Sequence, residues 1–214
     1  MAVSFPPILL ITDPAYSDGH TSRTIARVAT ELPPGALAVQ LRMKEKKPGD
    51  VLARAKDLRR LTEGLGVSLV INGDAVIAAE VGADGVHLGR GAVSIAEARR
   101  TCGPDIFVSV SAHDVDDVRR ALIEGATAVL VSPIYASPGK GKARGSKALR
   151  EAKDIGKDRL LVYALGGIES DNAGRCAAAG ADGVAVIRAL LAAKDVAAEA
   201  RALYEPFARR VPRN

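Results

Sequence analysis

Residues 82–88 read GADGVHL, and residues 180–186 read GADGVAV. In both stretches Gly-Ala closes a helical pattern, Asp-Gly makes a turn, and a buried apolar run begins. The repeated phrase therefore predicts a joint between a helix and the strand that follows it. A weaker copy, EGATAV, occupies residues 124–129. The number of such joints along the chain decides the fold.

Short apolar, β-branched runs recur at regular intervals between helical patterns. The runs are continuous rather than alternating, which is typical of parallel strands buried on both faces. We expect strands at 8–12, 36–42, 68–72, 84–88, 106–111, 127–132, 160–165 and 182–186. We expect helices at 21–32, 49–65, 74–82, 94–103, 114–125, 146–155, 171–180 and 187–204.

The alternation of strands and helices predicts an α/β protein, a single (β/α)8 TIM barrel that occupies residues 1–214. The GADGV joints would lie at the N-terminal face of this barrel. A doubly wound sheet is the alternative, but it normally carries GxGxxG after its first strand, and residues 8–20 contain no such motif.

Composition narrows the functional classes. The net charge is +5, but only 3% of residues are aromatic and Trp is absent, so platforms for stacking bases are scarce and we expect no nucleic-acid partner. No apolar run has the length of a membrane span, and the first residues do not resemble a secretory signal. We therefore expect a cytoplasmic protein without a membrane partner. The oligomeric state stays open, with a homodimer as one alternative.

Polar residues stand where most of the predicted strands end, which is where barrels carry their chemistry. The best-defined of these sites is for phosphate. Gly166 and Gly167 follow the seventh strand, and the eighth strand leads directly into a helix at Ile187-Arg188. Glycine amides and a helix start both favour an anion, so these two loops predict a phosphate site.

Seven motifs follow one another along most of the chain. They are QLRMK (40–44), VIN (70–72), GADGVHLG (82–89), VSVSAH (108–113), SPIYASPGK (132–140), ALGGI (164–168) and AGADGVAVI (179–187). As a set they resemble thiamine phosphate synthase and its relative, the thiazole tautomerase TenI. The resemblance implies a transferase that joins an aminopyrimidine methyl diphosphate to a hydroxyethylthiazole phosphate. Diphosphate would leave by way of a pyrimidine carbocation.

The resemblance also implies roles for individual residues. A catalytic group would consist of Ser111 near the reacting centre, Lys140 in the loop after the sixth strand, and His113. Residues matched to substrate binding are Gln40, Arg42, Lys44, Asn72, Ser137, Gly166, Gly167, Ile187 and Arg188. Ser137 replaces a threonine that is usual in the family.

The chain departs from the synthase pattern where the family binds magnesium. Synthases usually have acidic residues at the positions of Gly73 and Ala92. Because magnesium prefers carboxylates, their absence leaves Asp74 as the acidic candidate beside the third strand, with Arg90 as a substitute positive charge. Magnesium stays open as a cofactor.

These departures leave two alternatives to the synthase. A metal-independent, TenI-type thiazole tautomerase is favoured by Gly73, Ala92 and His113, because imidazole carries protons near neutral pH. A non-catalytic barrel that binds thiazole phosphate is the other. We interpret His87, in the fourth strand, as a packed core histidine.

Overall fold

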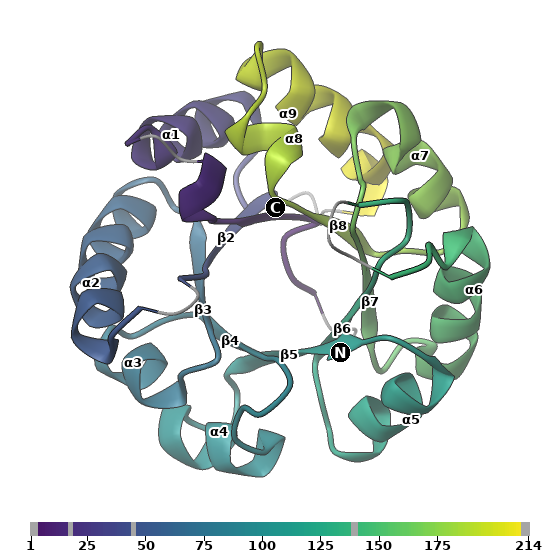
Figure 1. Cartoon of the computed structure of the whole chain (residues 1–214), viewed down its shortest axis with the longest axis horizontal. Coiled ribbons are helices and arrows are strands. Elements are labelled where there is room, and N and C mark those ends of the chain that lie inside the picture. The colour runs from purple at the N-terminus through teal and green to yellow at the C-terminus, as the bar shows by residue number, and fades with distance from the viewer. Residues whose placement is uncertain (1–3, 17–18, 44–45, 138–140, 211–214) are drawn as a thin grey trace.

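A computed structural model of the chain describes residues 4–16, 19–43, 46–137 and 141–210. Eight parallel strands pair in sequence order and close on themselves where β1 meets β8 (Figure 1). The predicted (β/α)8 barrel is therefore confirmed. The strands are β1 (Ile8–Ile11), β2 (Leu37–Leu41), β3 (Ser68–Asn72), β4 (Gly85–Leu88), β5 (Phe107–Ala112), β6 (Ala128–Val131), β7 (Leu161–Leu165) and β8 (Gly183–Val186).

The helices form an outer ring around the strands (Figure 1). They are α1 (Thr21–Glu31), α2 (Pro48–Gly64), α3 (Ala75–Glu80), α4 (Ile95–Cys102), α5 (Val115–Ile123), α6 (Gly145–Gly156), α7 (Ser170–Ala178), α8 (Arg188–Leu191) and α9 (Val196–Tyr204). Two 3-10 turns, η1 (Pro14–Tyr16) and η2 (Glu205–Arg210), complete the described elements. Of the helices in the described ranges, none combines the length and apolar character that a membrane span requires.

The prediction of one continuous helix over residues 187–204 is wrong. The chain forms the short helix α8 and then begins α9 at Val196. Asp195 precedes α9, and its carboxylate accepts a hydrogen bond from the backbone N–H of Ala198 at 3.0 Å. An aspartate in this capping position favours a new helix start over a continuous helix.

In every strand except β4, the apolar residues divide between two different cores. One core lies between the strands and the helices, and the other fills the interior of the barrel. The N-terminal segment covers this interior at the amino end of the strands. There Phe5 stacks on Phe107 with ring centroids 3.6 Å apart, and the Tyr163 hydroxyl donates to the carbonyl of Pro6 at 2.8 Å. The amino end is thus closed, and ligands must enter from the carboxyl end.

The repeated GADG phrase links each of its strands to the strand before it. The Asp84 carboxylate accepts from the N–H of Leu69 at 2.7 Å, and the Asp84 N–H donates back to the Leu69 carbonyl at 2.9 Å. Asp182 makes the same pair of hydrogen bonds with Val162, at 2.9 and 2.7 Å. The aspartate predicted as a turn residue therefore also pairs the first residues of neighbouring strands.

The weaker copy of the joint uses a hydroxyl for the same purpose. The Thr127 side chain accepts from the N–H of Val108 at 3.1 Å, and the Thr127 N–H donates to the Val108 carbonyl at 2.8 Å. All three joints thus hold the amino ends of adjacent strands in register.

The seam between β1 and β8 closes at a glycine. The N–H of Val184 donates to the Pro7 carbonyl at 2.8 Å. A Cβ added to Gly183 would lie 2.3 Å from that carbonyl oxygen and 2.5 Å from the Tyr163 ring. Residue 183 must therefore lack a side chain for the two strands to approach.

We predict that Gly183→Ala destabilises the protein by about 3 kcal/mol or more, because an added methyl group at a filled site forces backbone movement. Chemical denaturation followed by circular dichroism measures this change. Gly49→Ala is the matched control, since nothing lies within 4 Å of an added Cβ there. Equal unfolding free energies for the two variants would contradict the account of the seam.

Candidate active site

The carboxyl end of the barrel interior has a polar side and an apolar side. Strand alternation directs Gln40 and Asn72 inward, because each lies two residues beyond an inward-facing residue. His87 in β4, with Ser109 and Ser111 in β5, continues this polar side. The apolar side is formed by Ile11, Leu130, Leu165 and Ile187. The mouth is suited to a ligand whose polar atoms gather on one edge.

His87 is enclosed in this polar side and bonded through both ring nitrogens. Nδ1 lies 3.0 Å from the Ser109 hydroxyl, and Nε2 lies 3.1 Å from the Ser111 hydroxyl. Burial lowers the pKa of His87 to about 4, and the nearby Arg42 guanidinium contributes in the same direction. The imidazole is therefore neutral at physiological pH. Its predicted burial is confirmed, but it packs against hydroxyl groups rather than within an apolar core.

Gln40 lies near the carboxyl end of β2, and Arg42 directly follows that strand. The side chain of Gln40 is buried, yet its amide nitrogen has no hydrogen-bond partner among the described residues. Arg42 forms an ion pair with Asp13, at 2.7 Å from Nη1 to Oδ2, and its backbone N–H donates to the Thr12 hydroxyl at 3.0 Å. An unpaired donor and an oriented cation therefore stand on the same wall.

The loop after β7 packs tightly against the loop after β6. A Cβ added to Gly167 would lie 2.6 Å from the Ala136 carbonyl oxygen and 2.8 Å from the Tyr135 side chain. Gly166 and Gly167 both have positive φ angles, 96° and 64°. The two glycines are therefore required both by the backbone conformation and by the packing of the loop.

The backbone amides at this point are available to a ligand. Within the described part of the chain, the N–H groups of Gly167 and Arg188 donate to no protein oxygen. The carbonyl of Gly167 is fixed by the Asn172 side-chain amide at 2.9 Å, which holds the loop in place. Open N–H groups on two adjacent loops match the arrangement by which barrels bind anions after their last two strands, so these loops are the candidate anion site.

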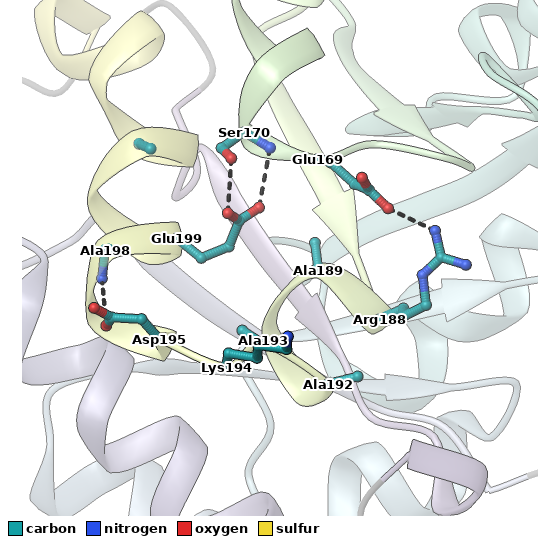
Figure 2. Close-up of a pocket in the computed structure, with 11 residues that line it drawn as sticks. Glu169, Ser170, Arg188, Ala189, Ala192, Ala193, Lys194, Asp195, Ala198 and Glu199 are labelled. Atoms are coloured by element: carbon teal, nitrogen blue, oxygen red, sulfur yellow. Dashed lines mark hydrogen bonds and ion pairs between the residues drawn. The ribbon is translucent and has the colours of Figure 1, made fainter.

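A hollow of about 530 Å³ lies between α7, α8 and α9, and Arg188 is among the residues that line it (Figure 2). Its floor is formed by Ala189, Ala192, Ala193, Ala198 and Ala202. Arg188 and Glu169 form an ion pair of 2.5 Å at its edge, and Glu199 accepts from both the N–H and the hydroxyl of Ser170 (Figure 2). The side chain of Arg188 is thus paired with Glu169, while its backbone N–H is part of the candidate anion site.

His113 lies on the rim, directly after β5. Its Nδ1 is 3.1 Å from the Ser132 carbonyl oxygen, and its backbone N–H donates to Asp117 at 2.8 Å. A carbonyl can only accept, so this contact requires a proton on Nδ1. In the neutral ring Nε2 then carries a lone pair, the arrangement that a general base needs.

The candidates for a metal site do not come together. Asp74 caps α3, with its Oδ1 accepting from the N–H of Ile77 at 2.9 Å. Gly73 and Ala92 supply no carboxylate, and no group of three or more His, Cys, Asp or Glu gathers anywhere in the described ranges. The two positions that are acidic in synthases therefore offer no ligand to a metal, and the Asp74 carboxylate is engaged in capping α3.

The remaining predicted residues are only partly placed. Asn72 ends β3 and is half-buried, and Ser137 is half-buried in the loop after β6. Lys44 and Lys140 lie outside the described residues. The described part of the barrel thus places predicted residues at the carboxyl ends of six strands, β2, β3, β5, β6, β7 and β8, without the two lysines.

The model of one protein family, described as thiamine monophosphate synthase, matches residues 8–190. The chain belongs to the thiamine monophosphate synthase family. It is 38% identical to a thiamine-phosphate synthase of Moorella thermoacetica over 192 residues, which cover 87% of this chain and 89% of that protein. It is 37% identical to the corresponding synthase of Bordetella avium over 210 residues, 95% and 96% of the two chains.

A solved structure of the same family has the same fold. The thiamine phosphate pyrophosphorylase of Pyrococcus furiosus superposes with a TM-score of 0.81 and 26% identity, and the alignment covers 96% of each chain. The resemblance that the seven motifs indicated is therefore confirmed for the family as a whole.

Two features of the site in this family member were missed by reasoning from the sequence. The pairing of Asp13 with Arg42 joins β1 to β2, and the contact of Ser109 with His87 joins β5 to β4. The contact of Ser109 with His87 had a weak signal in the sequence. Ser109 is a polar residue between two valines and lies two residues before Ser111, which places both hydroxyls on one face of the strand.

We predict a pH dependence of stability from His87. Its pKa is about 4 when folded and 6.5 in the unfolded chain, so only the unfolded chain takes up this proton between those values. Stability is therefore fully present above pH 6.5 and falls by roughly 3 kcal/mol as the pH drops towards 4. Urea denaturation between pH 4 and 7 measures it. The His87→Gln variant should lack this part of the slope, and parallel curves for the two proteins would contradict the prediction.

Proposed function

We propose that this chain is a thiamine-phosphate synthase, which joins an aminopyrimidine methyl diphosphate to a hydroxyethylthiazole phosphate and releases diphosphate. Family membership and the names of its relatives support this reaction. The observation that carries the proposal is the meeting of two subsites in one barrel mouth. The open amides of Gly167 and Arg188 suit the thiazole phosphate, and the polar wall of β2 to β5 suits the pyrimidine.

The polar wall supplies a positive charge, which the departure of diphosphate requires. The bond between the methylene carbon and the diphosphate oxygen breaks, and its electron pair leaves with the diphosphate. Arg42 is oriented by Asp13 and places a fixed positive charge on this wall, which stabilises the charge that gathers on the leaving group. The thiazole nitrogen then donates its lone pair to the methylene carbon and forms the new C–N bond.

The same wall is compatible with a carbocation on the pyrimidine. A protonated imidazole beside such a cation would repel it, but burial keeps His87 neutral. The unpaired amide of Gln40 and the Ser111 hydroxyl offer hydrogen bonds to the polar edge of the ring. His87 thus adds no positive charge beside the pyrimidine.

A tautomerase is the second candidate, and one observation favours it. The Nδ1 of His113 donates to the Ser132 carbonyl, and no described residue hydrogen-bonds its Nε2, as proton transfer on a thiazole ring would require. The two reactions use His113 differently. A tautomerase needs its imidazole for proton transfer, whereas the coupling reaction uses His113 at most as part of the rim.

We predict that Gly167→Ala weakens binding of hydroxyethylthiazole phosphate at least tenfold, about the loss of one hydrogen bond to a charged group. The added Cβ would meet the Ala136 carbonyl and displace the amide that binds phosphate. Isothermal titration calorimetry measures the affinity. Gly174→Ala in α7 is the control, because its Cβ would meet only Pro206 at 4.0 Å. Unchanged affinity in Gly167→Ala would place the phosphate elsewhere.

We predict that Asp74→Asn changes the rate of thiamine phosphate formation by no more than about threefold, the usual range for a peripheral substitution. Asparagine caps a helix as well as aspartate does, so the variant removes the charge and keeps the fold of α3. Chromatographic assay of thiamine phosphate from both substrates measures the rate. Loss of activity in this variant would show that Asp74 holds a metal after all.

The His113→Asn variant separates the two candidate reactions. A synthase should retain thiamine phosphate formation within about threefold in this variant. A tautomerase should make no thiamine phosphate, and His113→Asn should slow its isomerisation of the thiazole by on the order of 100-fold. A wild-type protein that isomerises the thiazole and fails to couple the two substrates would overturn the synthase proposal.

A further inference from the structure

We propose that His87 is a positioning residue that fixes the hydroxyl of Ser111 as a hydrogen-bond donor towards the mouth of the barrel. The arrangement of hydrogen bonds is independent of the reaction. Its consequence for catalysis rests on the proposed function, in which Ser111 contacts the pyrimidine substrate.

The strand register brings the three side chains together. His87 of β4 pairs with Ser109 of β5, and Ser111 lies two residues further along the same face of β5. The imidazole therefore faces both hydroxyls, at 3.0 Å from Nδ1 to Ser109 and at 3.1 Å from Nε2 to Ser111. Ser109 is completely buried below the ring, whereas Ser111 is half-buried above it.

Counting protons assigns the direction of each hydrogen bond. A neutral imidazole has one N–H and one bare nitrogen, so one serine must accept from the ring and the other must donate to it. If Nδ1 carried the proton, Ser109 would accept, and its own hydroxyl hydrogen would need a further acceptor. Among the described residues, Ser109 Oγ has no hydrogen-bond partner except His87. A buried hydroxyl hydrogen would then be left unsatisfied, which costs about 1–3 kcal/mol.

The opposite assignment leaves no fully buried group unsatisfied. Ser109 donates to Nδ1, and the proton on Nε2 is donated to the Ser111 oxygen. The Ser111 hydrogen is then left to point away from the ring, towards the mouth. A fixed donor at this place recognises an acceptor atom on the bound substrate, such as a pyrimidine ring nitrogen or a phosphate oxygen. Burial of His87 maintains this state, because a second ring proton would compete with the donation from Ser109.

The chain permits two variants that separate the contacts of His87. Asparagine carries its amide near the position of Nδ1, so His87→Asn can keep the contact to Ser109 and loses the contact to Ser111. Glutamine reaches the position of Nε2, so His87→Gln can still donate to Ser111. A positioning role therefore predicts more activity in the glutamine variant, whereas a packing role predicts that activity follows stability in both.

The first measurement is the tautomer of His87, by nitrogen-15 NMR of the imidazole rings at pH 7. We expect a neutral ring protonated on Nε2, and a shift of that nitrogen signal in Ser111→Ala. Protonation on Nδ1, or on both nitrogens, would overturn the proposal. This readout needs no substrate, so it decides the hydrogen-bond arrangement even if the chain fails to make thiamine phosphate, a failure that would overturn the proposed function alone.

The second measurement is a double-mutant cycle on thiamine phosphate formation. We expect His87→Asn and Ser111→Ala each to lower kcat by about tenfold, the worth of one hydrogen bond, and the double variant to be no slower than Ser111→Ala. His87→Gln should recover most of the loss, with unfolding free energies recorded for every variant. Additive losses in the cycle, or equal activity in the two His87 variants, would contradict the positioning role.

Discussion

The closure of the barrel at Gly183 is the constraint on which the rest of the molecule depends. Only a residue without a side chain lets the Pro7 carbonyl reach the N–H of Val184, and that contact joins the first strand to the last. Closure directs all eight carboxyl strand ends to one mouth. Residues as distant in sequence as Asp13 and Arg188 therefore contribute to the same end of the barrel.

The three helix-to-strand joints extend this constraint around the barrel. Asp84, Thr127 and Asp182 each bond the first residues of one strand to those of the strand before it. Because these contacts lie at the amino ends, they set the register without occupying the mouth. In this architecture the residues at the amino ends of the strands stabilise the fold, and the residues at the carboxyl ends carry the chemistry.

The division within the mouth follows from which strands carry polar residues. The side formed by β2 to β5 supplies an amide, a guanidinium, an imidazole and hydroxyls, whereas β6 to β8 supply apolar walls and the loops of the candidate anion site. Two phosphorylated rings can therefore meet in one mouth with their charged groups on different loops. A low-dielectric interior strengthens each of these contacts and keeps His87 neutral.

The architecture was predictable from the sequence, because buried parallel strands give continuous apolar runs and each run was placed within one or two residues of its strand. Once the strands were placed, the polar residues at their carboxyl ends could be predicted as well. The partners were not, since Asp13 with Arg42 and His87 with Ser109 meet only after the strands pair. The break between α8 and α9 was missed although Asp195 signalled it, because the alanine-rich segment satisfied a helical pattern on both sides.

The position of the product tests the account most directly. A crystal structure with thiamine phosphate should show the phosphate on the N–H groups of Gly167 and Arg188, with the pyrimidine against Gln40 and Ser111. A product bound across the hollow between α7 and α9, or with its two ends reversed, would contradict the assignment of the two subsites.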